Sequence, residues 1–174
     1  MNVKQQKSLA SIVLRVSILT CAFISCTKSP TTFEIGKPAP EIVVTAVDSN
    51  QNIHLKDLKG KVVILQFWQV GCHACLADIL EFKKLRNEIP ENKLAIIGIN
   101  VFGENNEIKK VQKEFKPNYS IDSKDSLNIT VQRYQVKILP TIFLLNSNGI
   151  AVKKYQGDIK LPDLKKDLMD LGLL

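Results

Sequence analysis

Two nearly continuous runs of apolar residues, Val62–Leu65 and Ala95–Ile99, constrain the fold of this chain most strongly. A strand with one solvated face alternates apolar and polar side chains, whereas an unbroken apolar run is typical of a central strand with helices packed on both faces. Stretches with helical periodicity separate the runs, which favours an α/β protein with a central mixed sheet flanked by helices. The length of 174 residues fits one such domain.

The two periodicities predict five strands and four helices. The predicted strands span residues 42–47, 62–68, 94–101, 141–146 and 150–155, and the predicted helices span residues 72–88, 104–115, 126–134 and 162–171. Asn146–Gly149 is a turn signal, so we expect the last two strands to form an antiparallel hairpin at a sheet edge. Two helices carry apolar core faces, formed by Leu76, Ile79, Leu80 and Leu85 in one and by Leu161, Leu164, Leu168 and Leu171 in the other.

The first 25 residues have the pattern of an export signal. They contain three basic residues and no acidic one, and the apolar stretch Val16–Ser25 is too short to span a bilayer as a helix. The sequence Phe23-Ile24-Ser25-Cys26 resembles a bacterial lipobox, with phenylalanine in place of the usual leucine, and predicts a lipid on Cys26. An uncleaved anchor and a plain signal peptide with an incidental cysteine are the alternatives.

This pattern divides the chain into a signal peptide at residues 1–25, a lipid-anchored tether at 26–35 and a folded domain at 36–174. We therefore expect the domain in the cell envelope, held to membrane lipid through Cys26 and facing the periplasm or the exterior.

The net charge of +7 does not indicate a nucleic-acid partner. Beyond the first 25 residues the chain carries 21 basic and 17 acidic side chains, a net charge of +4. The lysine pairs are spread along the chain without interleaved aromatic residues, which is typical of solvated faces.

The cysteines predict a redox pair. Of the four, Cys21 is lost with the signal and Cys26 is used by the lipid, so the exported domain keeps Cys72 and Cys75. Cys72 lies at the predicted start of a helix, where unpaired amides and the helix dipole favour a thiolate, the nucleophile in disulfide exchange. We expect Cys72 to attack substrates and Cys75, one turn inside the helix, to resolve the mixed disulfide.

Four motifs together give the chain a family resemblance. They are Gly36–Pro40, Leu55–Val63, Phe67-Trp68 with the two cysteines, and Leu139-Pro140-Thr141. With these motifs the chain resembles the thioredoxin-like superfamily and, within it, extracytoplasmic thiol-disulfide oxidoreductases of the TlpA/ResA type. The resemblance implies a thioredoxin-like fold with an N-terminal β extension, an inserted strand-helix segment within Glu104–Tyr134, and a cis peptide bond before Pro140.

The same resemblance implies an enzyme that reduces protein disulfides. Its partners would be proteins with disulfides and a membrane electron donor that recycles the dithiol, and no cofactor or metal is expected. The substrate stays open among an apocytochrome c, an envelope enzyme with a mispaired disulfide and a partner oxidoreductase. The direction of electron flow is an expectation from the resemblance alone, since known pairs span roughly −270 to −120 mV.

Four positions at the expected site need separate interpretation. Gly71 stands where this family usually has a large residue, and Gln66 where thioredoxin has a buried aspartate. Asp78, three residues after Cys75, is a candidate proton acceptor, with a solvated aspartate as the alternative. His73 is a candidate for stabilising the Cys72 thiolate when it is protonated.

Two other functions fit the sequence less well. A peroxiredoxin needs P-x-x-x-T-x-x-C, but Leu65 and Gln69 stand at the proline and threonine positions. A lipid-anchored module that binds copper or a redox partner is the alternative from another class. Copper-insertion relatives usually need C-x-x-x-C and a later histidine, whereas this chain has C-x-x-C and no histidine after His73; its other histidine, His54, is distant in sequence.

Overall fold

The computed structural model describes residues 32–47, 49–124 and 129–174, apart from the side chains of 122–124. These residues form one mixed sheet with the strand order β2-β1-β5-β4-β3-β6-β7. The strands are β1 (Val43–Ala46), β2 (Asn52–His54), β3 (Val62–Trp68), β4 (Leu94–Asn100), β5 (Ser120–Lys124), β6 (Thr141–Leu145) and β7 (Ala151–Gln156). The helices are η1 (Leu55–Leu58), α2 (His73–Glu88), α3 (Asn105–Phe115), α4 (Ile129–Arg133) and α5 (Leu161–Asp170).

The two apolar runs form the centre of the sheet. Strands β3 and β4 are parallel, paired from Val62↔Leu94 to Trp68↔Asn100, and every residue of both strands is buried. On the other side of β3, β6 runs antiparallel and continues into β7 at the sheet edge, which confirms the predicted hairpin. Because β3 and β4 are parallel, the loops that follow them leave the sheet at the same end, where both strands have their carboxyl ends.

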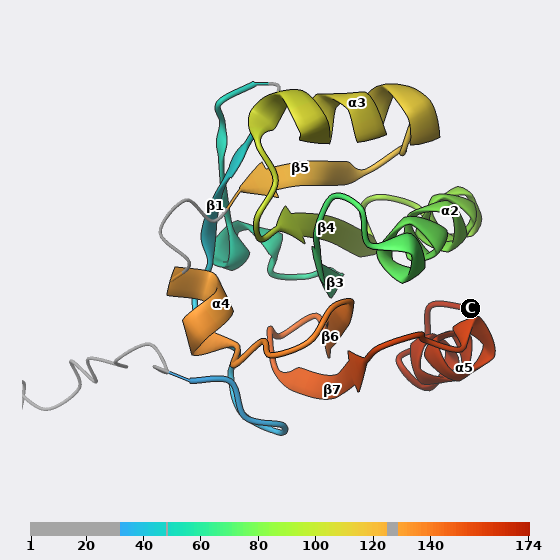
Figure 1. Cartoon of the computed structure of the whole chain (residues 1–174). Helices are drawn as coiled ribbons and strands as arrows, with labels where there is room; N and C mark the ends of the chain where they lie inside the picture. The colour runs from blue at the N-terminus through green and yellow to red at the C-terminus, as the bar shows by residue number, and fades with distance from the viewer. Residues whose placement is uncertain (1–31, 48, 125–128) are drawn as a thin grey trace, which may run out of the picture.

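Side chains of β3 alternate between two faces of the sheet. Helices α2, α3 and α5 cover one face, where Val62, Ile64 and Trp68 meet apolar residues of these helices. Figure 1 shows α2 and α5 on one side of the sheet and α4 on the other. The predicted leucine stripe of the last helix is confirmed, with Leu164 and Leu168 buried and Leu161 and Leu171 packed beside them.

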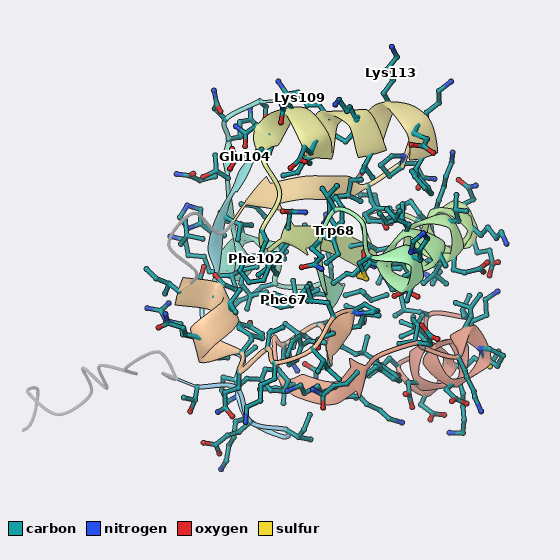
Figure 2. All side chains as sticks on the ribbon, in the orientation of Figure 1. Phe67, Trp68, Phe102, Glu104, Lys109 and Lys113 are labelled. Carbon is teal, nitrogen blue, oxygen red and sulfur yellow. A yellow bond between two sulfur atoms is a disulfide. The ribbon has the colours of Figure 1, made fainter. Side chains whose placement is uncertain are left out.

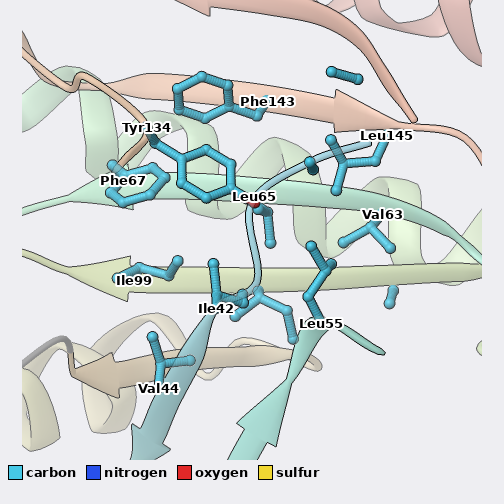
Figure 3. Packing of buried hydrophobic residues seen from close by; sticks show 14 of the residues in the cluster. Ile42, Val44, Leu55, Val63, Leu65, Phe67, Ile99, Tyr134, Phe143 and Leu145 are labelled. Carbon is cyan, nitrogen blue, oxygen red and sulfur yellow. The ribbon is translucent and has the colours of Figure 1, made fainter. Parts of the chain in front are cut away.

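The opposite face holds a cluster of four aromatic rings: Phe33, Phe67, Tyr134 and Phe143. Phe143 lies at the centre, with ring centroids 4.5 Å from Phe33, 5.0 Å from Tyr134 and 5.5 Å from Phe67. The Tyr134 hydroxyl donates a hydrogen bond to the Pro40 carbonyl (2.7 Å), and the Lys154 ammonium lies 5.4 Å from the centroid of the Phe143 ring. Figure 3 shows the rings of Phe67, Tyr134 and Phe143 packed together beside Leu65 of β3.

Some predicted details differ from the structure. The prediction missed β2 as a separate strand and placed no bounds on β5, which pairs with both β4 and β1. Leu80 was expected in the core but is 44% exposed, because the buried side of α2 follows Cys75, Ile79, Phe82 and Leu85. The first residues of the predicted helix at 126–134 lie outside the described residues. Within the described residues, α4 begins at Ile129.

The predicted signal peptide and Cys26 lie outside the described residues, as does most of the tether. Phe33, within the predicted tether range, packs in the aromatic cluster, and its backbone amide donates to the Arg133 carbonyl (2.9 Å). Within the part of the chain that the structure describes, no helix has the length and apolar character needed to cross a membrane.

Candidate active site

Cys72 and Cys75 form a disulfide at the junction of β3 and α2, with their Cα atoms 5.3 Å apart. Cys72 is the N-cap residue of α2, and its sulfur accepts a hydrogen bond from the backbone amide of Cys75 (3.2 Å). The amides of a first helical turn have no partner within the helix, and the positive end of the helix dipole lies there. This position therefore stabilises negative charge on the Cys72 sulfur once the bond is reduced. Figure 2 shows the disulfide at the start of α2.

The two cysteines differ in burial. Cys75 is fully buried in a cluster with Trp68 and Ile79, whereas Cys72 is partly exposed at its margin. Gly71, just before Cys72, is exposed and has φ +82°, and a Cβ built on it would meet no atom within 4 Å. The backbone conformation, and not crowding, therefore favours glycine at a position where the family resemblance predicts a large residue.

The peptide bond between Leu139 and Pro140 is cis, as predicted. Pro140 is buried at the start of β6, and Leu139 packs against the cluster that contains Cys75. The loop is held by two hydrogen bonds, from the Thr141 hydroxyl to the Ile138 carbonyl (2.6 Å) and from the Gly157 amide to the Pro140 carbonyl (2.9 Å). The segment before β6 is thus fixed beside the disulfide.

Asp78 is a buried carboxyl group one turn after Cys75, on the side of α2 that faces the sheet. The residue is 6% exposed, and Oδ2 has no hydrogen-bond partner among the described residues. Burial raises the pKa of Asp78 to about 7, assisted by the negative charges of Asp158 and Glu81, while a hydrogen bond from Gln66 opposes the rise. The alternative of a solvated aspartate is wrong, and the group is protonated in part near neutral pH.

Gln66 lies in the middle of β3 and is fully buried beneath the first turns of α2. Its Nε2 donates to the Cys75 carbonyl (3.2 Å), while Oε1 has no partner within the described part of the chain. Tyr119, which precedes β5, packs its ring against Phe82 with centroids 6.3 Å apart. Its hydroxyl is also buried without a partner among these residues, and burial and the Asp78 charge raise its pKa well above the ordinary value.

Comparison with known proteins places this geometry in a family. The model of the AhpC/TSA family matches residues 35–154, well over half of the chain. The chain belongs to the AhpC/TSA family. The ResA thiol-disulfide oxidoreductase of a Bacillus cereus strain is 32% identical over 125 residues, 72% of this chain and 71% of that protein. ResA of Geobacillus thermodenitrificans is 25% identical over 171 residues, covering 95% and 96% of the two chains.

Solved structures show the same fold. The thioredoxin domain of a thiol-disulfide oxidoreductase from Bacteroides vulgatus superposes with a TM-score of 0.67 at 22% identity, over 80% of this chain and 98% of that one. StoA from Bacillus subtilis gives a TM-score of 0.62 at 23% identity, over 75% and 97%. The thioredoxin-like fold is therefore confirmed, and with the named relatives and the Cys72–Cys75 pair it makes this member of the AhpC/TSA family a thiol-disulfide oxidoreductase.

Within the AhpC/TSA family, this chain departs from the peroxidase motif at both the proline and the threonine position. Leu65 is fully buried in β3 and packs in the apolar core, and Gln69 follows the end of β3. Neither supplies the proline or the threonine hydroxyl of that motif. The cysteine chemistry of this chain is that of a dithiol pair.

The histidines lie apart from each other. His73 is exposed in the first turn of α2, next to the disulfide, whereas the Nδ1 of His54 lies 4.0 Å from the Glu41 carboxylate. Among the described residues, no group of three or more His, Cys, Asp and Glu side chains is arranged to hold a metal ion.

Two exposed apolar residues lie in loops at the end of the sheet that carries the disulfide, and no sequence motif predicts a role for either. Phe102, in the loop between β4 and α3, is 72% exposed, and Ile138, just before the Leu139-Pro140 bond, is 51% exposed. Figure 2 labels Phe102 on that loop. The signal available in the sequence was positional, since Phe102 follows a central strand parallel to the one that carries the cysteines, and ligands of α/β sheets bind at the carboxyl ends of such strands.

The loop that carries Phe102 is held against the segment leading to Cys72. The Val101 amide donates to the Trp68 carbonyl (2.9 Å), and the Gly103 amide donates to Asn100 Oδ1. A Cβ on Gly103 would lie 2.9 Å from a methyl carbon of Val70 and 2.7 Å from Asn100 Oδ1. The side chain of Phe102 is therefore exposed, while hydrogen bonds and close packing hold the backbone of its loop in place.

Proposed function

We propose that this chain reduces disulfide bonds in exported proteins, with Cys72 as the attacking thiol and Cys75 as the resolving thiol. The observation that carries the proposal is the unequal burial of the bonded pair, with Cys75 fully buried and Cys72 partly exposed at the helix N-cap. A substrate sulfur can approach the exposed residue, and the first turn of α2 favours a thiolate there.

The reaction starts from the dithiol form. The Cys72 thiolate attacks one sulfur of a substrate disulfide, and the other substrate sulfur leaves as a thiolate, so that a mixed disulfide forms. The Cys75 thiol then loses its proton and attacks the Cys72 sulfur, which releases the second substrate thiolate. The substrate gains two electrons, the pair loses two, and the enzyme ends in the disulfide form seen in the structure.

Asp78 is the acceptor for the Cys75 proton in this proposal. Its carboxyl group lies one helical turn from Cys75 in a buried setting that raises its pKa to about 7. A group with a pKa near the working pH can both take up and return a proton, which a carboxyl group of ordinary pKa does poorly.

His73 and Pro140 have smaller roles. His73 lies at the exposed start of α2 next to Cys72, and a positive charge on its imidazole would stabilise the Cys72 thiolate. Pro140 fixes the segment that presents the backbone of Leu139 beside the cysteines, where an extended substrate strand can pair with it.

The exposed side chains of Phe102 and Ile138 favour a polypeptide as the substrate. Both are exposed apolar side chains on firmly held loops at the sheet edge where the disulfide lies. An unfolded or extended protein segment can cover them with apolar side chains near its cysteines, which a small hydrophilic disulfide cannot do.

The N-terminal pattern supports a position in the cell envelope, with a lipid on Cys26 and an electron donor in the membrane that regenerates the dithiol. Replacing Cys26 with alanine should release the protein into the soluble envelope fraction. Unchanged membrane attachment of that variant would indicate an uncleaved helix instead.

A trapping experiment tests the order of the two cysteines. Cys75→Ser should accumulate mixed disulfides with substrate proteins, because the resolving thiol is missing, and Cys72→Ser should not. If Cys72→Ser traps substrates instead, the assignment is reversed. In wild-type cells, alkylation after acid quenching should find the pair mainly as dithiol, and a pair found almost wholly as disulfide would overturn the reductase direction.

A further inference from the structure

Among the buried side-chain oxygens that have no hydrogen-bond partner within the described residues are Oε1 of Gln66 and Oδ2 of Asp78, both on the α2 face of the sheet. Buried polar atoms in folded proteins are paired in the great majority of cases, so an unpaired atom calls for an explanation. Both atoms belong to residues that surround Cys75, since Gln66 bonds to the Cys75 carbonyl and Asp78 follows one turn later.

Gln66 differs from every other side chain of β3 in being polar, and it faces α2. An amide offers two donor hydrogens on Nε2 and two acceptor sites on Oε1. Here Nε2 donates to the Cys75 carbonyl at 3.2 Å, and a hydrogen bond from the Gln66 side chain lowers the pKa of Asp78. One donor group therefore serves the backbone of the resolving cysteine and the carboxyl group beside it, and the acceptor side of the amide is unused.

We propose that Gln66 is a positioning residue that holds Cys75 through its carbonyl and serves Asp78 in both protonation states. Nε2 stabilises the carboxylate, and Oε1 accepts a hydrogen bond from the carboxylic acid after Asp78 has taken the Cys75 proton. The inference rests on the proposed role of Asp78. No electrons pass through Gln66, and the proton moves only from the Cys75 sulfur to an Asp78 oxygen.

The negative charges around Asp78 make its pKa depend strongly on the Gln66 amide. Asp158, in the loop before α5, and Glu81, on α2 itself, both repel a negative charge on Asp78, and a negative charge on Asp78 in turn raises the pKa of the Tyr119 phenol in the segment before β5. Gln66 is the group described there that lowers the pKa of Asp78. Without it only burial and repulsion remain, so the carboxyl group would hold its proton to higher pH.

The test measures how fast Cys75 resolves a mixed disulfide as pH changes. Reduced protein is mixed with the disulfide of thionitrobenzoate, and release of the second chromophore follows the attack of Cys75 on Cys72. In Gln66→Met, an apolar residue of similar length, the pH midpoint of this step should rise by about one unit, which slows the step about tenfold below the midpoint. Val63→Ala, on the same strand but the other face, should lose stability without moving the midpoint.

Two further measurements separate the possible failures. If Asp78→Asn keeps the wild-type midpoint, Asp78 is not the proton acceptor, and the proton step of the proposed function fails together with this inference. If Asp78→Asn removes the midpoint but Gln66→Met leaves it in place, only the role of Gln66 is overturned. Should Gln66→Met not fold, the side-chain amide resonances of Gln66 in the wild-type protein should shift with the titration of Asp78, and resonances that stay constant from pH 5 to 9 would contradict the proposal.

Discussion

The two faces of the central sheet differ in how their polar atoms are satisfied. On the aromatic face, the Tyr134 hydroxyl donates to the Pro40 carbonyl, and the rings otherwise pack on one another, with the Lys154 ammonium 5.4 Å from the centroid of Phe143. On the α2 face, side-chain atoms of Gln66, Asp78 and Tyr119 are buried without a partner among the described residues. The aromatic face therefore contributes stability, and the α2 face gives up stability to hold a carboxyl group beside the disulfide.

The largest expected effect lies on the aromatic face. Phe143→Ala removes a fully buried ring that contacts the other three and leaves a cavity in the core, which should lower the unfolding free energy by about 3–5 kcal/mol. Denaturant unfolding of the oxidised protein measures this. The pH midpoint of the resolving step should not move, and a clear shift would mean that the two faces are not separate in function.

On the α2 face, removing a charge should stabilise the protein. The folded state holds the Asp78 proton up to about pH 7, whereas the unfolded chain releases it near pH 4, so stability should fall as pH rises between these values. Asp78→Asn removes this fall and should be more stable than the wild type at pH 8, on the order of 2–4 kcal/mol. Urea unfolding at pH 4.5 and pH 8 measures the difference.

The control for this prediction is the low-pH comparison. At pH 4.5 both folded proteins carry a neutral group at position 78, so the difference between their stabilities should shrink to about 1 kcal/mol or less. A variant that is less stable than the wild type at pH 8 would show that the Asp78 carboxylate is well solvated or paired. That result would contradict the view that the α2 face leaves its polar atoms unsatisfied.

Removing the hydroxyl of Tyr134 or of Tyr119 compares the two faces directly, and the expected changes in stability are of intermediate size. Tyr134→Phe leaves the Pro40 carbonyl without its donor and should cost about 1–2 kcal/mol. Tyr119→Phe removes a hydroxyl that is buried without a partner among the described residues and should be neutral or stabilising. Equal losses for both substitutions, measured by thermal unfolding, would mean that the α2 face satisfies its polar atoms as well as the aromatic face does.

The smallest effect on stability is expected for Phe102. Because the ring is exposed, Phe102→Ser should change the unfolding free energy by less than about 0.5 kcal/mol, as should Met169→Ser on the distant helix α5. Exchange with a disulfide peptide that carries apolar residues beside its cysteines should slow in Phe102→Ser alone, and exchange with oxidised glutathione should not change. Equal rates with both substrates would remove Phe102 from substrate binding.

The strands with continuous apolar runs could be predicted from the sequence because their own side chains specify burial on both faces. The bounds of 62–68 agree with β3, and 94–101 differs from β4 by one residue. Strand β2 has three residues, and β5 has the sequence SIDSK, so neither carries a pattern of its own. Strand β2 forms because the nearby β1 offers a hydrogen-bonding edge, and β5 forms because β4 and β1, which lie farther away in sequence, offer edges on its two sides.

The candidate site was predictable in part. The position of Cys72 at a helix start follows from the local periodicity, and the cis bond before Pro140 follows from the family resemblance. The burial of Asp78 does not, because the sheet beneath α2 decides which side of the helix is covered, and the same uncertainty led to Leu80 being assigned to the core. Phe102 lacked any motif, and its place near the disulfide depends on the parallel pairing of β3 and β4.

The most direct test of this account is a titration of Asp78 in the oxidised protein, followed through the NMR signal of its side-chain carboxyl carbon, with Asp78→Asn used to assign the signal. Desolvation beside the disulfide and repulsion by Asp158 predict a midpoint near pH 7. A midpoint close to the ordinary aspartate value of about 4 would contradict it, because the α2 face would then hold a solvated carboxylate unable to take the Cys75 proton.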